Sequence, residues 1–214
     1  MPTAIPIDDP RDPRIAGYRD VRERDLVGRE GRFIAEGEVV LRLLLRSPRH
    51  RPESLLLAEK RVATLAPLLA EVPDGVPVYS AGQAVLDAIV GFPLHRGILA
   101  LGRREPLPAP DDLLAGLGPR ALVAVLCGIG NHDNLGGIFR NCAAFGADAV
   151  LLDPTCCDPL YRKAIRVSVG ATLTVPYARI DAGTDVVELL ARHGFAAIAL
   201  SPAGAVPLAE LRRP

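Results

Sequence analysis

The sequence contains no tryptophan and a single methionine, and aromatic residues make up only 4% of the chain. Its core must therefore be built from aliphatic side chains. Hydrophobic residues form 49% of the 214 positions, which is enough for a large packed core. The chain also lacks an excess of one charge, because 25 Lys and Arg balance 25 Asp and Glu. This balance excludes a protein that binds nucleic acid through its overall charge, but it allows a local basic patch.

Long apolar runs and cysteine motifs are absent as well. No stretch reaches the roughly 18 uninterrupted apolar residues of a membrane span, and the first residues lack the basic-then-apolar pattern of a signal peptide. The four cysteines are Cys127, Cys142, Cys156 and Cys157, and none form a C-x-x-C motif. We therefore expect free thiols in a cytoplasmic protein that contacts no membrane and binds no metal.

The first half of the chain predicts a small α/β domain. Residues 1–29 are expected to form a loose, proline-rich tail followed by a charged helix. From residue 30 to residue 103, short apolar segments alternate with helical patterns. The expected strands are 32–35, 54–58, 76–79 and 97–101, and the expected helices are 39–44, 61–69 and 80–90, the last capped by Ser80.

The second half predicts a mostly parallel α/β domain. Residues 104–117 are rich in proline and charge and are expected to link the first domain to a second at 118–214. The apolar run 121–126 is typical of a strand covered on both faces. Further strands are expected at 149–152, around Val175 and at 195–200, and alternation with helices indicates a parallel sheet.

A loop rich in glycine and asparagine, residues 128–134, connects the first strand of this domain to its helix. Such a loop can expose backbone N–H groups to an anion, as in dinucleotide folds and P-loops. However, Asp133 stands where the third glycine of G-x-G-x-x-G belongs, and no G-x-x-x-x-G-K-[ST] motif occurs. Spacing alone allows two alternatives. The loop is either a turn that needs glycine only for its geometry, or the ligand loop of a small-molecule α/β enzyme.

The residues after this loop carry a resemblance to a known family. The string NHDNLGGIFRNCAAFG, residues 131–146, resembles the first signature of the SpoU/TrmH family of RNA ribose 2′-O-methyltransferases. Asn134 matches the asparagine of that signature and Arg140 its arginine. The strings that fit the same pattern elsewhere are ADAVLL at 147–152, KAIRVSVGA at 163–171, FIAEG at 33–37 and HRGILA at 95–100. The resemblance covers roughly residues 30–200.

The resemblance implies a two-domain α/β protein, with a small RNA substrate-binding domain at 30–103 and a SPOUT-type methyltransferase domain at 118–214. It implies S-adenosylmethionine as methyl donor, a ribose 2′-hydroxyl of tRNA or rRNA as acceptor, and a homodimer. Two later family signatures, a Gly-x-Glu loop and an Ile-Pro segment leading to Ser-Leu-Asn, do not follow Ser201 before Pro214. We therefore expect an incomplete trefoil knot and cofactor pocket in this chain, and a non-catalytic RNA-binding relic is the alternative function.

The same resemblance implies that Arg140 helps to activate the ribose hydroxyl. A guanidinium stays protonated in proteins and is a very poor base, so we expect it to clamp a phosphate and stabilise the developing alkoxide. Arg140 lies off the apolar stripe of its helix and can face a groove. Asn134 is expected to cap the helix and to orient Arg140 or the substrate backbone.

Three cations of the second domain form a candidate RNA-binding cluster. Arg162 and Arg166 are four residues apart on an expected helix, with Lys163 between them, so like charges face each other at a small cost. An RNA phosphate would relieve that repulsion. A solvated helix face explains the charges equally well.

Overall fold

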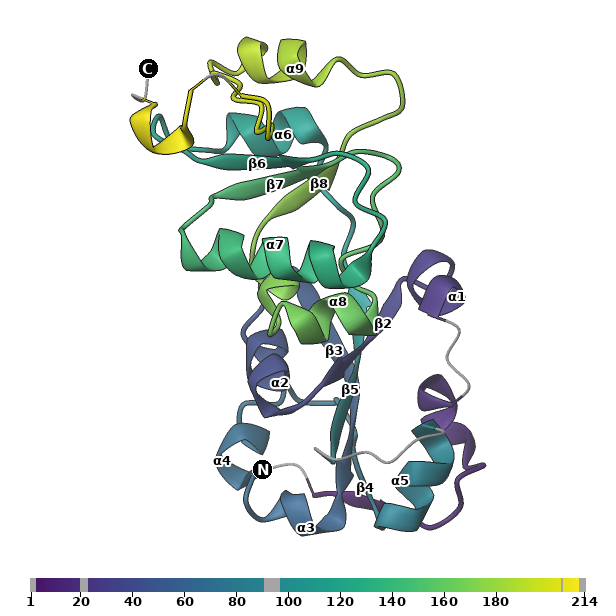
Figure 1. The fold of residues 1–214 in the computed structure, drawn as a ribbon. Helices are drawn as coiled ribbons and strands as arrows, with labels where there is room; N and C mark the ends of the chain where they lie inside the picture. The colour runs from purple at the N-terminus through teal and green to yellow at the C-terminus, as the bar shows by residue number, and fades with distance from the viewer. Residues whose placement is uncertain (1–2, 20–22, 91–96, 205, 212–214) are drawn as a thin grey trace.

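The computed structural model describes residues 3–19, 23–90, 97–204 and 206–211. It contains two β-sheets with helix α8 between them (Figure 1). The strands are β1 (Ile5–Ile7), β2 (Arg32–Glu36), β3 (His50–Ala58), β4 (Val78–Ala81), β5 (Ile98–Arg104), β6 (Val123–Leu126), β7 (Ala149–Leu152) and β8 (Tyr177–Arg179). The α-helices are α1 (Glu23–Gly28), α2 (Glu38–Leu45), α3 (Glu59–Val62), α4 (Ala66–Leu69), α5 (Gln83–Val90), α6 (Pro110–Ala115), α7 (His132–Ala144), α8 (Arg162–Val167) and α9 (Val186–Arg192). The 3-10 helices are η1 (Pro13–Tyr18), η2 (Ala171–Leu173) and η3 (Leu208–Glu210). No helix in the described ranges is long and apolar enough to cross a membrane.

The first sheet has the strand order β1-β4-β3-β5-β2 and is covered on both faces. Strands β1, β4 and β3 run parallel, whereas β5 runs antiparallel to both β3 and β2. Side chains of β3 alternate between two cores: Leu55 and Leu57 pack under α2 and α4, and Leu56 packs on the side of η1 and α5. This alternation follows from the two-residue period of a strand.

The second sheet has the order β6-β7-β8 and is parallel throughout. Helix α7 covers one face, above Val150 and Leu152, and α6 and α9 cover the other face, above Leu151 (Figure 1). The central strand β7 is therefore buried along its whole length. Strand β6 lies at the edge, and its residues 123–125 are only half-buried. Its side chains nevertheless pack on both faces, Ala124 and Leu126 under α7 and Val123 and Val125 under α6 and α9, as the apolar run predicts.

Two expectations for the first sheet are wrong because parallel pairing extends it. Residues 1–13 are not all a loose tail, since Ile5–Ile7 pairs with β4 and Ile7 is buried. Ser80 does not cap a helix. It lies inside β4, between β1 and β3, and α5 begins at Gln83. The expected helix 61–69 splits into α3 and α4, with Pro67 in the first turn of α4, where its missing N–H costs no hydrogen bond.

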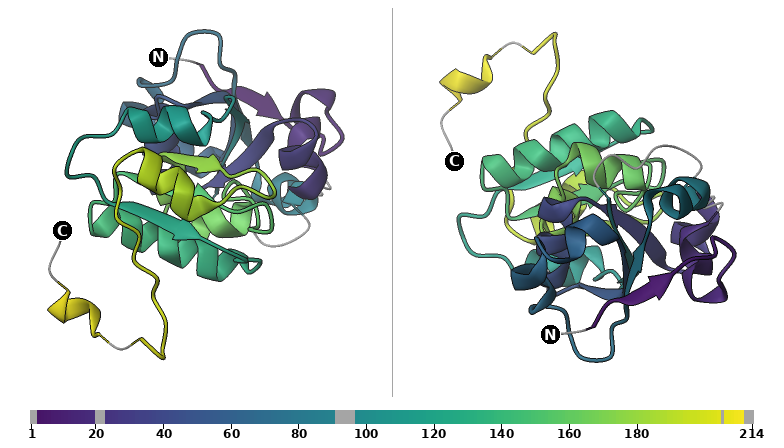
Figure 2. Two further views of the ribbon diagram at one scale, coloured as in Figure 1. Left: turned by 90° about the horizontal axis from the view of Figure 1, so that it is seen from above. Right: turned by 90° about the horizontal axis from the view of Figure 1, so that it is seen from below.

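The expected strand 195–200 is not formed. These residues have no regular structure and are mostly exposed, and the segment after α9 extends away from the body of the molecule (Figure 2). The expected linker is also shorter at both ends, because β5 runs to Arg104 and α6 begins at Pro110. Of the string HRGILA, His95 and Arg96 lie outside the described residues, and Ile98 begins β5.

Candidate functional site

Helix α7 carries the two candidate catalytic residues, and its start is defined by Asn131. The Asn131 side-chain oxygen accepts hydrogen bonds from the backbone N–H groups of Asp133, at 2.8 Å, and Asn134, at 3.2 Å. The expectation that Asn134 caps this helix is therefore wrong. A capping residue must have non-helical backbone angles, as Asn131 does, whereas Asn134 lies in the first turn with its side chain exposed.

The glycine-rich loop before α7 is closed by an internal carboxylate. Gly128 has a positive φ of 70°, and its N–H donates to Asp153 at 2.9 Å. Asp153 also accepts hydrogen bonds from Thr155 and from the backbone of Cys156. Burial alone would raise the pKa of Asp153, but these hydrogen bonds outweigh it and hold the pKa below its ordinary value. A loop amide that binds a carboxylate of the protein is unavailable to a pyrophosphate, which counts against a dinucleotide site.

Sequence reasoning missed Asp153. The signal was present, because Asp153 directly follows a buried strand and precedes Thr155 by two residues, a spacing typical of Asx turns.

Glycine at position 136 allows α7 to approach α8 closely. A Cβ atom there would lie 2.8 Å from the Ala164 carbonyl oxygen and 2.9 Å from Cβ of Val167. At the next position, Gly137, a Cβ would meet nothing within 4 Å. The first of the two glycines is therefore required by helix packing, and the second is not.

Arg140 lies on the exposed side of α7. Leu135, Phe139 and Cys142 point into the core beneath the helix, and Arg140 is directed away from them, as the periodicity predicts. Among the described residues, no hydrogen bond or ion pair reaches the Arg140 side chain. Its guanidinium is thus available to an external anion. Asn134 is likewise exposed, and neither residue lines the pocket described below.

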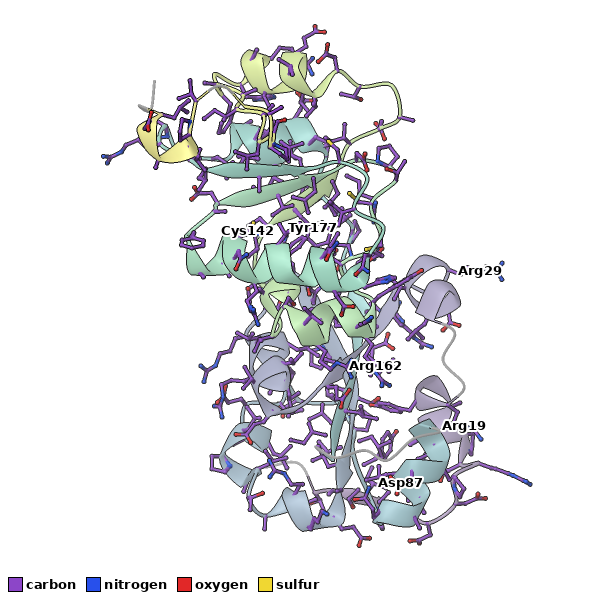
Figure 3. The ribbon with its side chains drawn as sticks, in the orientation of Figure 1. Arg19, Arg29, Asp87, Cys142, Arg162 and Tyr177 are labelled. Atoms are coloured by element: carbon purple, nitrogen blue, oxygen red, sulfur yellow. The ribbon has the colours of Figure 1, made fainter. Side chains whose placement is uncertain are left out.

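The predicted cationic cluster of α8 is split by its surroundings. Arg162 lies at the boundary with the first sheet (Figure 3), and its Nε is 3.6 Å from a carboxylate oxygen of Glu36 on β2. Lys163 forms an ion pair of 2.6 Å with Asp133 at the start of α7. Arg166 is exposed, and within the described ranges no ion pair involves its side chain. Only Lys163 and Arg166 therefore face solvent.

The boundary between the two sheets, which we call the junction, is well packed. Leu160, Ile165 and Leu173 belong to the hydrophobic core under α2, together with residues of the first sheet. Arg104 on β5 forms an ion pair with Asp158, and Arg49 donates to the Val175 carbonyl oxygen at 2.7 Å.

Two buried polar side chains at the junction, His50 and Tyr177, lack hydrogen-bond partners among the described residues. Burial lowers the pKa of His50 to about 4, and the nearby charges of Arg49 and Arg104 act in the same direction. Burial raises the pKa of Tyr177 to about 12. Both groups are therefore neutral at pH 7.

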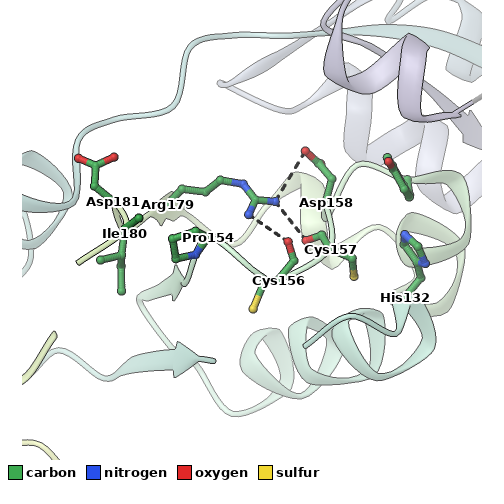
Figure 4. A pocket seen from close by; sticks show the side chains of 10 residues that line it. His132, Pro154, Cys156, Cys157, Asp158, Arg179, Ile180 and Asp181 are labelled. Carbon is green, nitrogen blue, oxygen red and sulfur yellow. Dashed lines mark hydrogen bonds and ion pairs between the residues drawn. The ribbon is translucent and has the colours of Figure 1, made fainter. Parts of the chain in front are cut away.

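A pocket of about 550 Å³ lies at the carboxyl ends of the three parallel strands (Figure 4). Arg179 crosses it from β8 and donates to the carbonyl oxygens of Cys156, at 3.1 Å, and Cys157, at 3.2 Å. The His132 ring, at the start of α7, stacks on Tyr161 with 4.6 Å between centroids. The residues that line the pocket are His132, Pro154, Cys156, Cys157, Asp158, Tyr161, Arg179, Ile180, Asp181 and Ala182.

All four cysteines are free thiols. Burial raises the pKa of Cys142, Cys156 and Cys157, which keeps these thiols protonated and poorly reactive. In the part of the chain that the structure describes, no three His, Cys, Asp or Glu side chains gather where they could hold a metal ion.

Comparisons with known proteins agree on one family. Residues 121–214 match the model of the SpoU rRNA Methylase family. An uncharacterized tRNA/rRNA methyltransferase of Mycobacterium bovis is 42% identical over 200 residues, which cover 92% of this chain and 67% of the relative. A relative from Mycobacterium avium, also an uncharacterized tRNA/rRNA methyltransferase, is 34% identical over 140 residues, or 64% of this chain and 45% of its own length.

Solved structures share the fold at lower sequence identity. The AdoMet-bound rRNA methyltransferase from Sinorhizobium meliloti superposes with a TM-score of 0.69 at 18% identity, covering 89% of this chain and 68% of that chain. An RNA 2′-O ribose methyltransferase superposes with a TM-score of 0.61 at 22% identity, and the match covers 89% of this chain and 70% of that chain. The chain belongs to the SpoU family of tRNA/rRNA methyltransferases, and it has the α/β fold with parallel strands that the sequence resemblance implies.

Proposed function

We propose that this protein transfers a methyl group from S-adenosylmethionine to a ribose 2′-hydroxyl of tRNA or rRNA. The observation that carries the proposal is Arg140, an exposed guanidinium without an internal partner, placed on α7 by the segment that resembles the family's first signature. The structural likeness to an RNA 2′-O ribose methyltransferase supports the choice of acceptor.

In this mechanism Arg140 binds a phosphate next to the target ribose. Its positive charge stabilises the alkoxide that develops as the hydroxyl passes its proton to water. The ribose oxygen then takes the methyl group, and S-adenosylhomocysteine is the leaving group. A guanidinium can hold a phosphate through two parallel hydrogen bonds, which fixes the position of the ribose. The Asn134 amide, six residues earlier on α7, positions the RNA backbone.

Lys163 and Arg166 extend the RNA-binding surface onto α8. We propose phosphate contacts for both: Arg166 is exposed without an ion pair among the described residues, and Lys163, also exposed, would exchange its contact with Asp133 for the phosphate. Arg162 contributes indirectly, since its contact with Glu36 helps to hold α8 in place. In this proposal residues 30–103 form the substrate-binding domain and residues 118–214 the methyltransferase domain, and the protein acts as a homodimer, which light scattering can test.

S-adenosylmethionine supplies the methyl group when bound. Among the described residues that line the pocket near His132, no cation is free to hold the carboxylate of this cofactor, because Arg179 is already held by Asp158 and by backbone carbonyl oxygens. We therefore route no step of the mechanism through this pocket.

The test is the position of the transferred methyl group. The protein is incubated with unmodified tRNA or rRNA and with S-adenosylmethionine labelled in the methyl group, and the RNA is then hydrolysed with alkali. Alkaline cleavage requires a free 2′-hydroxyl, so ribose methylation leaves the label in alkali-resistant dinucleotides. Label in mononucleotides would contradict ribose as the acceptor. RNA binding without any transfer would favour the non-catalytic alternative.

A further inference from the structure

The pocket at the carboxyl ends of β6, β7 and β8 has no role in the mechanism above. It lies between the loop after β7, the loop after β8 and the start of α7 (Figure 4). Ligands of parallel α/β sheets commonly bind at this edge, and a volume of about 550 Å³ is within the range of small-molecule sites. The question is which chemistry its walls accept.

One wall offers a flat surface and an unused polar atom. The rings of His132 and Tyr161 are stacked with 19° between their planes. The Nε2 atom of His132 is buried, and it makes no hydrogen bond with any described residue. A buried imidazole nitrogen without a partner is costly unless a ligand or water satisfies it, and it can donate or accept according to the tautomer.

The charges of the pocket argue against a phosphate. Among the described residues that line it, one guanidinium occurs: Arg179 is 3.8 Å from the Asp158 carboxylate and donates to the backbone oxygens of Cys156 and Cys157. Asp181 adds a second carboxylate to the lining. Asp158 is itself compensated by Arg104 and Arg179, so the carboxylate of Asp181 is the one charge of the described lining without an ion-pair partner. A single free carboxylate repels an anion and suits a neutral, flat ligand that carries N–H donors.

We propose that this pocket holds a nucleobase of the RNA substrate, and that it favours a base with an exocyclic amino group over uracil. This inference rests on the proposed function, because that function brings RNA to α7. Arg140 is eight residues beyond His132 on the same helix, so phosphate and base contacts are separated by about 12 Å along it. We therefore assign the pocket to a base other than the methylated one.

The test is a nuclear magnetic resonance titration of the full chain with guanosine, adenosine, cytidine and uridine, following the imidazole resonances. The His132 resonance should shift saturably with the first three nucleosides. Uridine should bind about five-fold more weakly, since it lacks the amino group that a carboxylate accepts from. His193, which is bonded to Asp111 on the opposite face of the sheet, is the internal control and should not shift.

Variants separate stacking from hydrogen bonding. His132→Phe keeps an aromatic ring beside Tyr161 but removes Nε2, so nucleosides should bind several-fold more weakly. Asp181→Asn should reduce the preference for nucleosides with an exocyclic amino group over uridine. Asp74→Asn changes an exposed carboxylate near the first sheet and should leave this preference unchanged. Unaltered binding in His132→Phe and Asp181→Asn would overturn the proposal.

Two further ligands test whether the pocket instead binds an anion or the cofactor. Inorganic phosphate should not shift His132, and a saturable shift would reveal an anion site instead. S-adenosylhomocysteine should bind this pocket no better than adenosine does. A much tighter shift of His132 would assign the pocket to the cofactor and overturn the proposal. These titrations do not depend on methyl transfer. The base-pocket proposal can therefore fail while the alkaline-hydrolysis test confirms ribose methylation, and ribose methylation can fail while the pocket still binds nucleosides.

Discussion

The arginines at the junction and the arginine on the outer side of α7 differ in their partners rather than in their chemistry. Arg104 is bonded to Asp158, and Arg49 to the Val175 carbonyl oxygen. Arg140 has no such partner among the described residues. Nearly all cations of this chain are arginines, with Lys60 and Lys163 the exceptions, so residue type cannot distinguish a structural guanidinium from a functional one. The comparison teaches that an internal partner marks a guanidinium as structural, whereas a functional role for a free one has to be tested.

The largest effect is expected for Arg140→Ala. Because the side chain binds a substrate phosphate and stabilises the charge that develops in the transition state, its loss should reduce kcat/KM by about 10²–10³-fold. The thermal unfolding midpoint should not change, since no internal contact is lost. Arg120→Ala, at another exposed arginine of the same region, is the control and should retain full activity. Equal activity in the two variants would remove Arg140 from the mechanism.

The junction should respond to pH through His50. Its pKa is lowered to about 4 in the folded protein, against about 6.5 in the unfolded chain. Below pH 6.5 the unfolded chain binds the proton and the folded protein does not. The stabilisation present above pH 6.5 is therefore lost as the pH falls toward 4, by at most about 3 kcal/mol.

Urea unfolding at several pH values measures this loss. His50→Leu should flatten the profile between pH 6.5 and pH 4, because the apolar side chain cannot be protonated. An unchanged slope in that variant would mean that another group causes the acid sensitivity.

Arg104→Met should destabilise the junction. The change removes one partner of an ion pair in which both side chains are largely buried, and it leaves Asp158 with Arg179 at 3.8 Å. We expect a loss of about 2 kcal/mol in the free energy of unfolding. As a control, Arg46→Met breaks the ion pair between Arg46, which is exposed, and Glu71. This change should lower the free energy of unfolding by less than about 1 kcal/mol. Similar losses in both variants would contradict a structural role specific to the junction.

A smaller contrast is expected between the two adjacent glycines of α7. Gly136→Ala places a methyl group against the backbone of α8 and should cost about 1–3 kcal/mol. Gly137→Ala meets open space and should stabilise the helix by about 0.5–1 kcal/mol. Calorimetric unfolding of the two variants tests the sign of each change, and destabilisation by Gly137→Ala would show that this face of α7 is also packed.

Local patterns predicted the strands and helices that contain their own signals. Strand β6 was identified from a continuous apolar run, and the apolar face of α7 from helical spacing. Predictions that depended on distant partners were less successful. Strand β1 exists because β4 pairs with it, and Ser80 is extended because strands flank it on both sides. Residues 195–200 have strand composition but no described strand beside them, and they remain irregular.

The candidate site shows the same division. Asn134 and Arg140 could be identified from one continuous segment, although the choice of capping residue was wrong by three positions. The pocket could not be predicted, because His132, Asp158 and Arg179 come from different loops and strands that only the parallel sheet brings together.

The order of residues alone determined the family, the helix that carries Arg140 and the apolar faces of the main elements, because these properties depend on neighbours within a few positions. The tertiary structure decided which cations are engaged and which are available. Arg162 is drawn toward Glu36 and Lys163 toward Asp133, while Arg140 keeps an open side. Electrostatic attraction acts over a few ångströms in space, whatever the separation along the chain, and therefore depends on the folded arrangement.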